Sequence, residues 1–432
     1  MTTEQATAEY IARSGKEAWI VPGLPADLKR RPVNSVGIIG AGTMGGGIAM
    51  NFASAGIPVT IVETKQEALE RGLGVVRTNY QRSADRGRFP QDEVDIRMGR
   101  ISGTLDMGDL ADCDLIIEAV FEDMELKKSI FARLDGIVKQ GAILGTNTSG
   151  LDIDAIAAQT KRPEDVIGLH FFSPANVMKL LEIVRADHTA DDVVATSMDI
   201  AQKIGKIAAL VGVCPGFVGN RILRQRQVQA TKLVYRGIMP WDVDGALNQF
   251  GFRMGPFQMS DLAGLDIGWK KGATTENPIR DALCEMDRRG QKTGAGYYDY
   301  DESRNRQPSP VTERIIGEIT GVDTKAGSPM SADEIIEACI YPMINEAVKI
   351  LEDGKAQRPG DIDVIWLNGY GWPADKGGVM WFADQVGAKE VLRVMEAIAA
   401  DDDRFTPAET LRELAANGGK FTEIDKGGLR VG

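Results

Sequence analysis

The stretch Val36-Gly-Ile-Ile-Gly40-Ala-Gly42-Thr-Met-Gly45 decides the fold of this 432-residue chain. A short apolar run ends at Gly40, and a helical pattern follows from Ile48 to Ala55. Three glycines at this spacing, between a strand and a helix, are the fingerprint of a dinucleotide-binding turn. A glycine turn without a ligand is the alternative, and the flanking strand and helix make it the weaker interpretation.

Each glycine has an expected role in that turn. Gly40 allows the tight turn, Gly42 lets the backbone approach a pyrophosphate, and Gly45 permits close packing of the helix on the strand. The helix N-terminus favours the anion. Glu63 follows Gly45 by 18 residues, at the end of the next apolar strand. It is expected to bind the adenosine ribose and repel a 2′-phosphate, so NAD is predicted over NADP, a preference that Lys65 tempers slightly.

Further apolar runs at 115–120 and 142–145, each followed by helical sequence, predict more strands of the same sheet. Strands that alternate with helices indicate an α/β fold, a Rossmann-like doubly wound parallel sheet. We expect a dinucleotide-binding domain over residues 32–215. Residues 1–31 are interpreted as a helix, Thr3 to Trp19, and a Pro-rich linker remnant.

Long helical patterns dominate after about residue 215, including 220–235 and 243–250. The predicted arrangement is a first helical domain over 216–301, a linker over 302–331 that is rich in Ser, Pro, Gly and Thr, and a second helical domain over 332–432. The two helical domains resemble each other, since matching Gly, Asp and aromatic positions recur in the same order at offsets of 117 to 123 residues. Chance similarity is the alternative. The first set is Gly237, Asp242, Asp244, Phe250, Phe252, Gly255, Asp261 and Gly264; the second is Gly354, Asp361, Asp363, Tyr370, Trp372, Gly377, Asp384 and Gly387.

Composition excludes several classes of function. The net charge of −12 argues against nucleic acid as a partner. The four cysteines are scattered, so neither a disulfide framework nor a metal site is expected. No apolar run is long enough to span a membrane, and neither a signal peptide nor a C-terminal peroxisomal tripeptide is present, so a cytoplasmic location is expected.

His170 and Glu182 are the candidate catalytic pair. The chain has only two histidines, and the other, His188, lies in a polar stretch typical of a surface. The alternative for His170 is a structural role in the core. Glu182 lies in an apolar run, where burying a carboxylate without a partner costs free energy. Together they explain each other, because a carboxylate fixes the imidazole tautomer and stabilises the imidazolium.

Two polar segments are candidates for the substrate site. Thr146-Asn-Thr-Ser149 follows a predicted strand, at the sheet edge where ligands bind. A helix cap is an equally good explanation for it. Pro215-Gly-Phe-Val-Gly-Asn220-Arg221 lies at the junction with the helical region, where a ligand cleft is natural and a plain connector is the alternative.

Taken together, the motifs resemble the 3-hydroxyacyl-CoA dehydrogenase family over roughly residues 20–432. They are the glycine turn, 117–122, Asn147-Thr-Ser149, His170-Phe-Phe-Ser-Pro174, Leu181-Glu182 and 215–221, with 254–257, 292–294 and 368–371 further on. The resemblance implies that His170 and Glu182 are catalytic and that Ser149 and Asn220 bind substrate. It places the cofactor against Gly40, Gly42, Thr43, Met44, Gly45, Glu63, Ala119, Glu122, Lys127, Ser149 and Ser173.

By this resemblance the chain is expected to oxidise (S)-3-hydroxyacyl-CoA to 3-ketoacyl-CoA with NAD, with an acyl-CoA thioester as partner and no metal. The doubled helical block is similar to the dehydrogenase half of multifunctional fatty-acid oxidation enzymes, here without their enoyl-CoA hydratase domain. A monomer, with the two blocks paired as an internal pseudo-dimer, is therefore expected. The alternatives are a dehydrogenase of a free hydroxy acid or sugar acid, and a non-catalytic NAD-binding protein.

Two departures from the family pattern stand out. Gly219 replaces a larger aliphatic residue, and Ala374-Asp-Lys376 replaces a more basic stretch.

Overall fold

The computed structural model describes residues 2–25, 27–272 and 274–429. The chain divides into two compact units. The first comprises Met1–Arg221, Ile350–Tyr370 and Thr422–Gly432, and the second comprises Ile222–Lys349 and Gly371–Phe421. One helix of the predicted second helical domain therefore belongs to the same unit as the predicted dinucleotide-binding domain.

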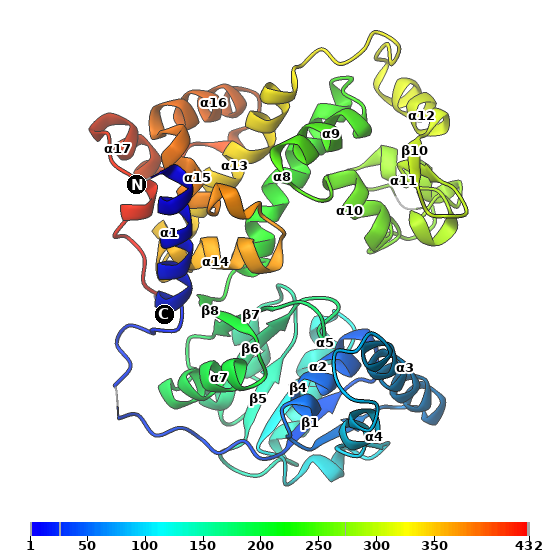
Figure 1. Ribbon diagram of the computed structural model, residues 1–432, viewed down its shortest axis with the longest axis vertical. Coiled ribbons are helices and arrows are strands. Elements are labelled where there is room, and N and C mark those ends of the chain that lie inside the picture. The colour runs from blue at the N-terminus through cyan, green and yellow to red at the C-terminus, as the bar shows by residue number, and fades with distance from the viewer. Residues whose placement is uncertain (1, 26, 273, 430–432) are drawn as a thin grey trace. The chain divides into compact units, whose positions relative to one another are not determined.

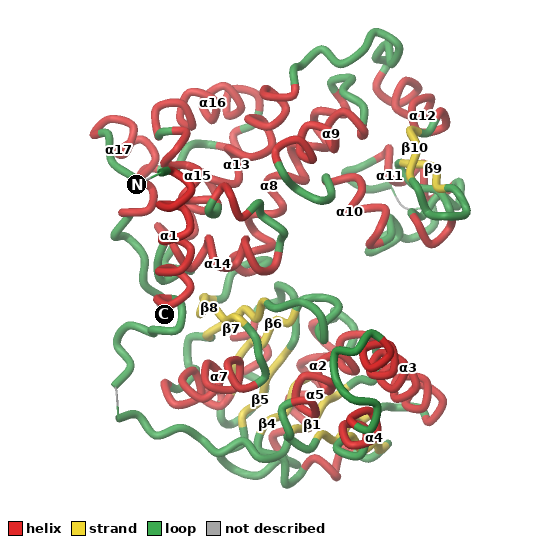
Figure 2. Tube along the Cα trace, in the orientation of Figure 1, coloured by secondary structure: helices red, strands yellow, loops and turns green. Residues whose placement is uncertain are grey.

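The first unit contains an eight-stranded sheet in the order β3-β2-β1-β4-β5-β6-β7-β8 (Figure 2). Strands β1 to β6 run parallel, as predicted, whereas β7 runs antiparallel to β6 and β8 runs parallel to β7. The sheet is thus Rossmann-like, with two added strands that run in the opposite direction. The strands are β1 Val36–Ile39, β2 Val59–Val62, β3 Ile101–Thr104, β4 Leu115–Glu118, β5 Ile143–Thr146, β6 Val166–Phe171, β7 Leu180–Arg185 and β8 Ile207–Gly212.

Helices cover both faces of this sheet (Figure 1). Buried side chains of α2, α3 and α7 form one core with alternate residues of the strands. On the opposite face, α6 packs so closely that a Cβ on Gly168 would meet the Ile153 side chain at 2.4 Å. The helices of this unit are α1 Thr3–Glu17, α2 Thr43–Ser54, α3 Gln66–Asp85, α4 Glu93–Met98, α5 Met124–Asp135, α6 Ile153–Ala157, α7 Asp191–Lys203 and α14 Pro359–Gly369.

The predicted N-terminal helix is present as α1, and it packs against α14 (Figure 1). The buried Tyr10 hydroxyl donates to Asp363 Oδ2 at 2.7 Å. Ser14 lies against Gly360, where a Cβ would come within 2.8 Å of the serine Oγ. These contacts make α1 part of the folded unit.

The second unit is mainly helical. Its elements are the remainder of α8 (Phe217–Tyr235), α9 Pro240–Phe250, α10 Pro256–Ala263, α11 Pro278–Glu285, α12 Pro310–Thr320, α13 Ala332–Glu352, α15 Val379–Val386, α16 Ala388–Asp401 and α17 Glu409–Asn417, with a small antiparallel sheet of β9 Tyr298–Tyr300 and β10 Arg306–Pro308. The last three residues of the predicted second domain, 430–432, lie outside the described residues.

The stretch 302–331, predicted as a linker, contains strand β10 and helix α12. Ser309 caps α12, Pro310 occupies its first turn and Gly321 ends it in the left-handed conformation. Buried Ile315 and Ile316 anchor the helix. The polar composition predicts a linker, whereas the capping serine, the proline and the glycine specify a helix. Residues 306–320 therefore form β10 and α12 and are not a linker.

An aromatic cluster joins the two helical blocks inside the second unit. Phe252 meets Trp372 edge to face at 5.6 Å, and Phe250 meets Phe382 at 5.1 Å. Phe252 and Trp372 occupy matching positions of the predicted repeat, so the blocks pair through equivalent residues. A Cβ on Gly251 would lie 2.7 Å from Pro373, which shows how closely the two segments approach.

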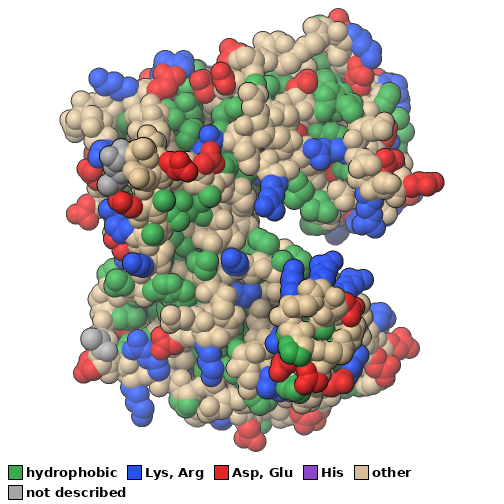
Figure 3. Space-filling model, in the orientation of Figure 1, with side chains coloured by type: hydrophobic (Ala, Val, Ile, Leu, Met, Phe, Trp, Pro, Cys, Tyr) green, Lys and Arg blue, Asp and Glu red, His purple; other side chains and the backbone are tan. Residues whose placement is uncertain are grey.

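The surface seen in Figure 3 intersperses acidic and basic side chains. The four cysteines are buried and free. Among the described residues, none of the helices combines the length and apolar character that a membrane span requires.

Candidate active site

His170 and Glu182 face each other on neighbouring antiparallel strands. The register of β6 and β7 places the two residues directly opposite one another. His170 Nδ1 lies 2.7 Å from Glu182 Oε2, and both side chains are buried. The direct pairing follows from the antiparallel direction of β7, since directly opposed side chains on one face meet.

The carboxylate of Glu182 is held at both oxygens. Its Oε1 accepts from the backbone N–H of Gly219 at 2.9 Å, while Oε2 meets the imidazole. A carboxylate only accepts, so Nδ1 of His170 is the donor and Nε2 is left with its lone pair. Phe172 and Phe217 flank the imidazole, at ring-centroid distances of 4.4 and 5.7 Å. This arrangement suits a general base.

Ser149 lies at the carboxyl end of the sheet, bound to Glu122. Glu122 Oε1 accepts from the Ser149 N–H at 2.8 Å, the Ser149 hydroxyl at 2.9 Å and the Thr148 hydroxyl at 2.7 Å. Burial works to raise the pKa of Glu122, but these hydrogen bonds and the nearby Lys127 outweigh it, so the pKa is lowered. Glu122 therefore stays ionised and fixes Ser149.

Asn220 lies beside Ser149 at the start of α8. Its Nδ2 donates to the Ser149 carbonyl oxygen at 3.3 Å, and its Oδ1 accepts from the Tyr370 hydroxyl at 2.8 Å. Asn147 Oδ1 accepts from the Phe171 N–H at 2.8 Å, which ties this segment to the strand of His170. The residues predicted from two separate motifs, Ser149 and Asn220, are thus brought together. Tyr370 was not predicted as a site residue.

The glycine turn has the geometry that a dinucleotide needs. Gly40 has a φ of +106°, and a Cβ there would lie 2.8 Å from the carbonyl oxygen of Ala119. A Cβ on Gly45 would lie 1.9 Å from the carbonyl oxygen of Gly40, so no side chain fits between helix α2 and the turn. No atom lies within 4 Å of a Cβ built on Gly42, which leaves room for a pyrophosphate. Thr43 begins α2, with Met44 next to it.

A cavity of about 530 Å³ adjoins this turn. Gly42, Thr43 and Glu63 line it, together with Lys65 and Arg71. Glu63 accepts from the Ala41 N–H at 3.1 Å and from the Thr64 N–H at 2.7 Å. Burial works to raise the pKa of Glu63, but these backbone hydrogen bonds outweigh it and the pKa is lowered. The carboxylate is therefore charged where the adenosine ribose would lie.

Lys127 lies in a buried charged cluster. Its Nζ lies 2.7 Å from Glu118 Oε1 and 3.5 Å from Glu122 Oε2, and only 1% of the lysine side chain is exposed. Glu118, which was not predicted as a site residue, also accepts from the Thr146 hydroxyl at 2.6 Å. The Lys127 ammonium is thus turned to two carboxylates, one of which, Glu122, binds Ser149.

Ser173 is exposed and precedes Pro174, in a segment held from two sides. The carbonyl oxygen of Ala175 accepts from Asn51 Nδ2 at 3.0 Å and from Lys206 Nζ at 2.6 Å. Burial lowers the pKa of Lys206 to about 8. Pro174 lines the cavity of the glycine turn, which brings Ser173 to the rim of the predicted cofactor site.

Comparison with known proteins agrees with this geometry. Residues 35–214 match the NAD-binding domain of 3-hydroxyacyl-CoA dehydrogenase, and residues 216–300 and 335–429 match its C-terminal domain. The chain belongs to the 3-hydroxyacyl-CoA dehydrogenase family. Because both helical blocks match the C-terminal domain, the predicted repeat is confirmed, and NAD is the cofactor of the sheet domain.

Relatives within this dehydrogenase family cover nearly the whole chain. A peroxisomal bifunctional enzyme from Cavia porcellus is 45% identical over 90% of the chain, and that from Homo sapiens is 41% identical over 90%. The chain spans 57% of the length of each of these relatives. The dehydrogenase part of multifunctional enzyme 1 from C. elegans is 30% identical, with a TM-score of 0.66 over 94% of this chain and 96% of that chain.

A solved 3-hydroxybutyryl-CoA dehydrogenase from Escherichia coli is also similar. It is 26% identical, with a TM-score of 0.75 over 89% of this chain and 98% of that chain.

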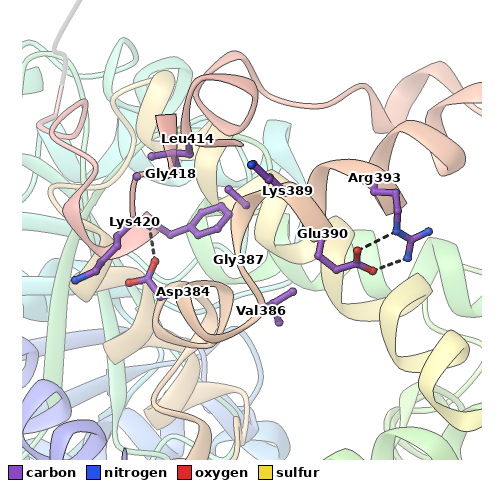
Figure 4. Close-up of a pocket in the computed structure, with 12 residues that line it drawn as sticks. Asp384, Val386, Gly387, Lys389, Glu390, Arg393, Leu414, Gly418 and Lys420 are labelled. Carbon is purple, nitrogen blue, oxygen red and sulfur yellow. Dashed lines mark hydrogen bonds and ion pairs between the residues drawn. The ribbon is translucent and has the colours of Figure 1, made fainter. Parts of the chain in front are cut away.

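A second cavity, of about 560 Å³, lies wholly in the second helical block (Figure 4). Its cations are Lys389, Arg393 and Lys420. Arg393 is already paired with Glu390, and Asp384 accepts from the Phe421 N–H. None of the predicted site residues lines this cavity, and the segment Ala374–Lys376 that departs from the family pattern does not line it either.

Proposed function

We propose that this chain oxidises the 3-hydroxyl of an (S)-3-hydroxyacyl-CoA thioester to a ketone. The observation that carries the proposal is the buried pair of His170 and Glu182, with Nδ1 and Oε2 2.7 Å apart. Oxidation of an alcohol by NAD requires removal of the hydroxyl proton as the hydride leaves, and a buried histidine paired with a carboxylate is suited to that task. The names of the relatives support a coenzyme A thioester as the substrate.

His170 is the proposed general base. Nδ1 donates to Glu182, so Nε2 is the atom that removes the hydroxyl proton. Proton uptake converts the ring to an imidazolium, and the adjacent Glu182 carboxylate stabilises that charge. The Gly219 N–H keeps the carboxylate in place during this change.

The glycine turn and its neighbours are proposed to hold NAD. When bound, NAD supplies the hydride acceptor. Gly42 leaves space at the N-terminus of α2 for the pyrophosphate, and Glu63 is placed to bind the adenosine ribose. Glu122, which accepts from the Ser149 hydroxyl at 2.9 Å, is proposed to line the cofactor site as well.

Ser149 and Asn220 are proposed to position the substrate. Each carries a hydroxyl or amide group that can contact an oxygen of the thioester, and the contact at 3.3 Å holds the two together. Their contribution is orientation, which can supply several kcal/mol of the rate enhancement in a well-aligned site.

The experiment that tests the function is an NADH-forming assay across substrate classes. We expect turnover of (S)-3-hydroxybutyryl-CoA and longer 3-hydroxyacyl-CoA thioesters, and no comparable turnover of free 3-hydroxybutyrate or a sugar acid. Faster turnover of a free acid would contradict a coenzyme A thioester as the substrate and would indicate a hydroxy-acid dehydrogenase. Absence of turnover with every substrate, despite NADH binding, would indicate a non-catalytic NAD-binding protein.

Assembly and location complete the proposal. The aromatic cluster of Phe250, Phe252, Trp372 and Phe382 supports pairing of the two blocks within one chain, and hence a monomer. The expected cytoplasmic location stays a prediction, because named relatives are peroxisomal. Cell fractionation against a peroxisomal marker enzyme decides between the two.

A further inference from the structure

Tyr370 lies at the end of α14, in the second helical block, and contacts the candidate active site. Its hydroxyl is 2.8 Å from Asn220 Oδ1. Its ring stacks on Trp366 at 4.6 Å and meets the edge of Phe172 at 5.3 Å. Phe172 in turn packs against His170 at 4.4 Å. Tyr370 thus touches one site residue directly and reaches the histidine through one ring.

Gly219 provides the space that Tyr370 fills. A Cβ on Gly219 would lie 2.3 Å from the tyrosine ring and hydroxyl, so any larger residue would displace the ring. Glycine at position 219 is therefore the residue that accommodates the tyrosine ring. The N–H of the same Gly219 donates to Glu182. The tyrosine therefore packs directly on the backbone that holds the catalytic carboxylate.

The hydrogen bonds fix the orientation of the Asn220 amide. The Ser149 carbonyl oxygen can only accept, so the NH₂ of Asn220 faces it and Oδ1 faces Tyr370. Burial, together with the nearby Glu182 charge, raises the pKa of Tyr370 well above its usual value. The phenol consequently stays protonated and donates to Oδ1. One hydrogen of the Asn220 NH₂ is left for the substrate.

We propose that Tyr370 is a positioning residue for the dehydrogenase reaction, supplied by the second helical block, which orients Asn220 through its hydroxyl. The inference rests on the proposed function. A comparison of the two blocks supports this role for Tyr370. The matching residue of the first block is Phe250, which has no hydroxyl and packs in the aromatic cluster. A hydroxyl is present only in the block whose aromatic residue meets Asn220.

The test is a double-mutant cycle of Tyr370→Phe and Asn220→Ala. Tyr370→Phe keeps the ring and removes only the hydroxyl. We expect it to lower kcat/KM for (S)-3-hydroxybutyryl-CoA by about 5- to 20-fold, the range of one lost hydrogen bond, with the Kd of NADH within twofold of wild type. In the Asn220→Ala background the same change should alter kcat/KM by less than about twofold, because its target is gone. The Kd of acetoacetyl-CoA, from calorimetry, gives a second readout of the cycle.

Tyr10→Phe is the matched control. It removes another buried tyrosine hydroxyl that contacts α14, through Asp363, and Tyr10 contacts none of the site residues in the described hydrogen bonds. It should lower the melting temperature without changing kcat/KM. If Tyr370→Phe and Tyr10→Phe behave alike in both measurements, the role of Tyr370 is merely structural and the inference fails.

Two further results overturn the inference. Wild-type kcat/KM in Tyr370→Phe would do so, as would an undiminished effect of Tyr370→Phe in the Asn220→Ala background. In both cases the proposed function stands, because the wild-type enzyme turns over its substrate. Failure of the wild-type enzyme on every thioester removes the proposed function and the inference together.

Discussion

At the scale of single residues, we propose that Glu63 sets the choice between NAD and NADP. Its carboxylate lines the cavity beside the glycine turn, and backbone N–H groups keep it ionised. Lys65 and Arg71 line the same cavity and could attract a phosphate. The balance between one carboxylate and two cations is therefore a testable property of this site.

We predict that the enzyme prefers NAD to NADP in kcat/KM by at least about 100-fold, because like charges in contact cost several kcal/mol. Glu63→Gln should reduce that ratio at least about tenfold, since it removes the repulsion and leaves the cations. Steady-state kinetics with both cofactors measure it. Equal kcat/KM values in the wild-type enzyme would mean that Lys65 or Arg71 already neutralises Glu63.

The site residues differ in how visible they are in the sequence. The pair of His170 and Glu182 could be predicted, because histidine is scarce here and a carboxylate in an apolar run needs a partner. Glu118 shows the same signal, because it is a carboxylate in the apolar run 115–120. Its partner could not be predicted, because Lys127 lies in a helix and the sequence does not specify which face of that helix is buried. Tyr370 could not be predicted, because its contact with Asn220 spans 150 residues.

At the scale of elements, the direction of β7 brings His170 and Glu182, the proposed catalytic pair, together. The apolar run of β7 predicts a buried strand but not its direction, because a strand buried on both faces has the same composition in either direction. The antiparallel register then places His170 opposite Glu182. A strand running the other way would not give this register, so the proposed catalytic pair depends on the reversal of the sheet at β7.

Helices α12 and α14 show two further limits of prediction from sequence. Composition hid α12, although its capping residue and proline were readable. Helix α14 was predicted within a helical domain, yet it belongs to the unit of the sheet, where Gly369 lies so close to Leu180 that a Cβ would come within 2.4 Å. The unit to which a helix belongs depends on contacts between residues far apart in the sequence, which local sequence patterns do not encode.

At the scale of the whole molecule, the repeat provides two blocks that pair within one chain. The paired aromatic residues Phe252 and Trp372 occupy matching positions in the two blocks. We predict a monomer, because a covalently tethered block is at high effective concentration and outcompetes a second chain. Light scattering should give a mass near 46.8 kDa. A concentration-independent mass of twice that value would contradict the internal pseudo-dimer.

The central claim is that His170, oriented by Glu182, is the general base of a 3-hydroxyacyl-CoA dehydrogenase. The most direct test compares NADH formation from (S)-3-hydroxybutyryl-CoA by the wild-type enzyme and by His170→Gln, with NADH affinity measured in parallel. We predict that the substitution lowers kcat by about 10²–10⁴-fold and leaves the Kd of NADH within twofold of wild type. Near-normal kcat in His170→Gln would contradict the account.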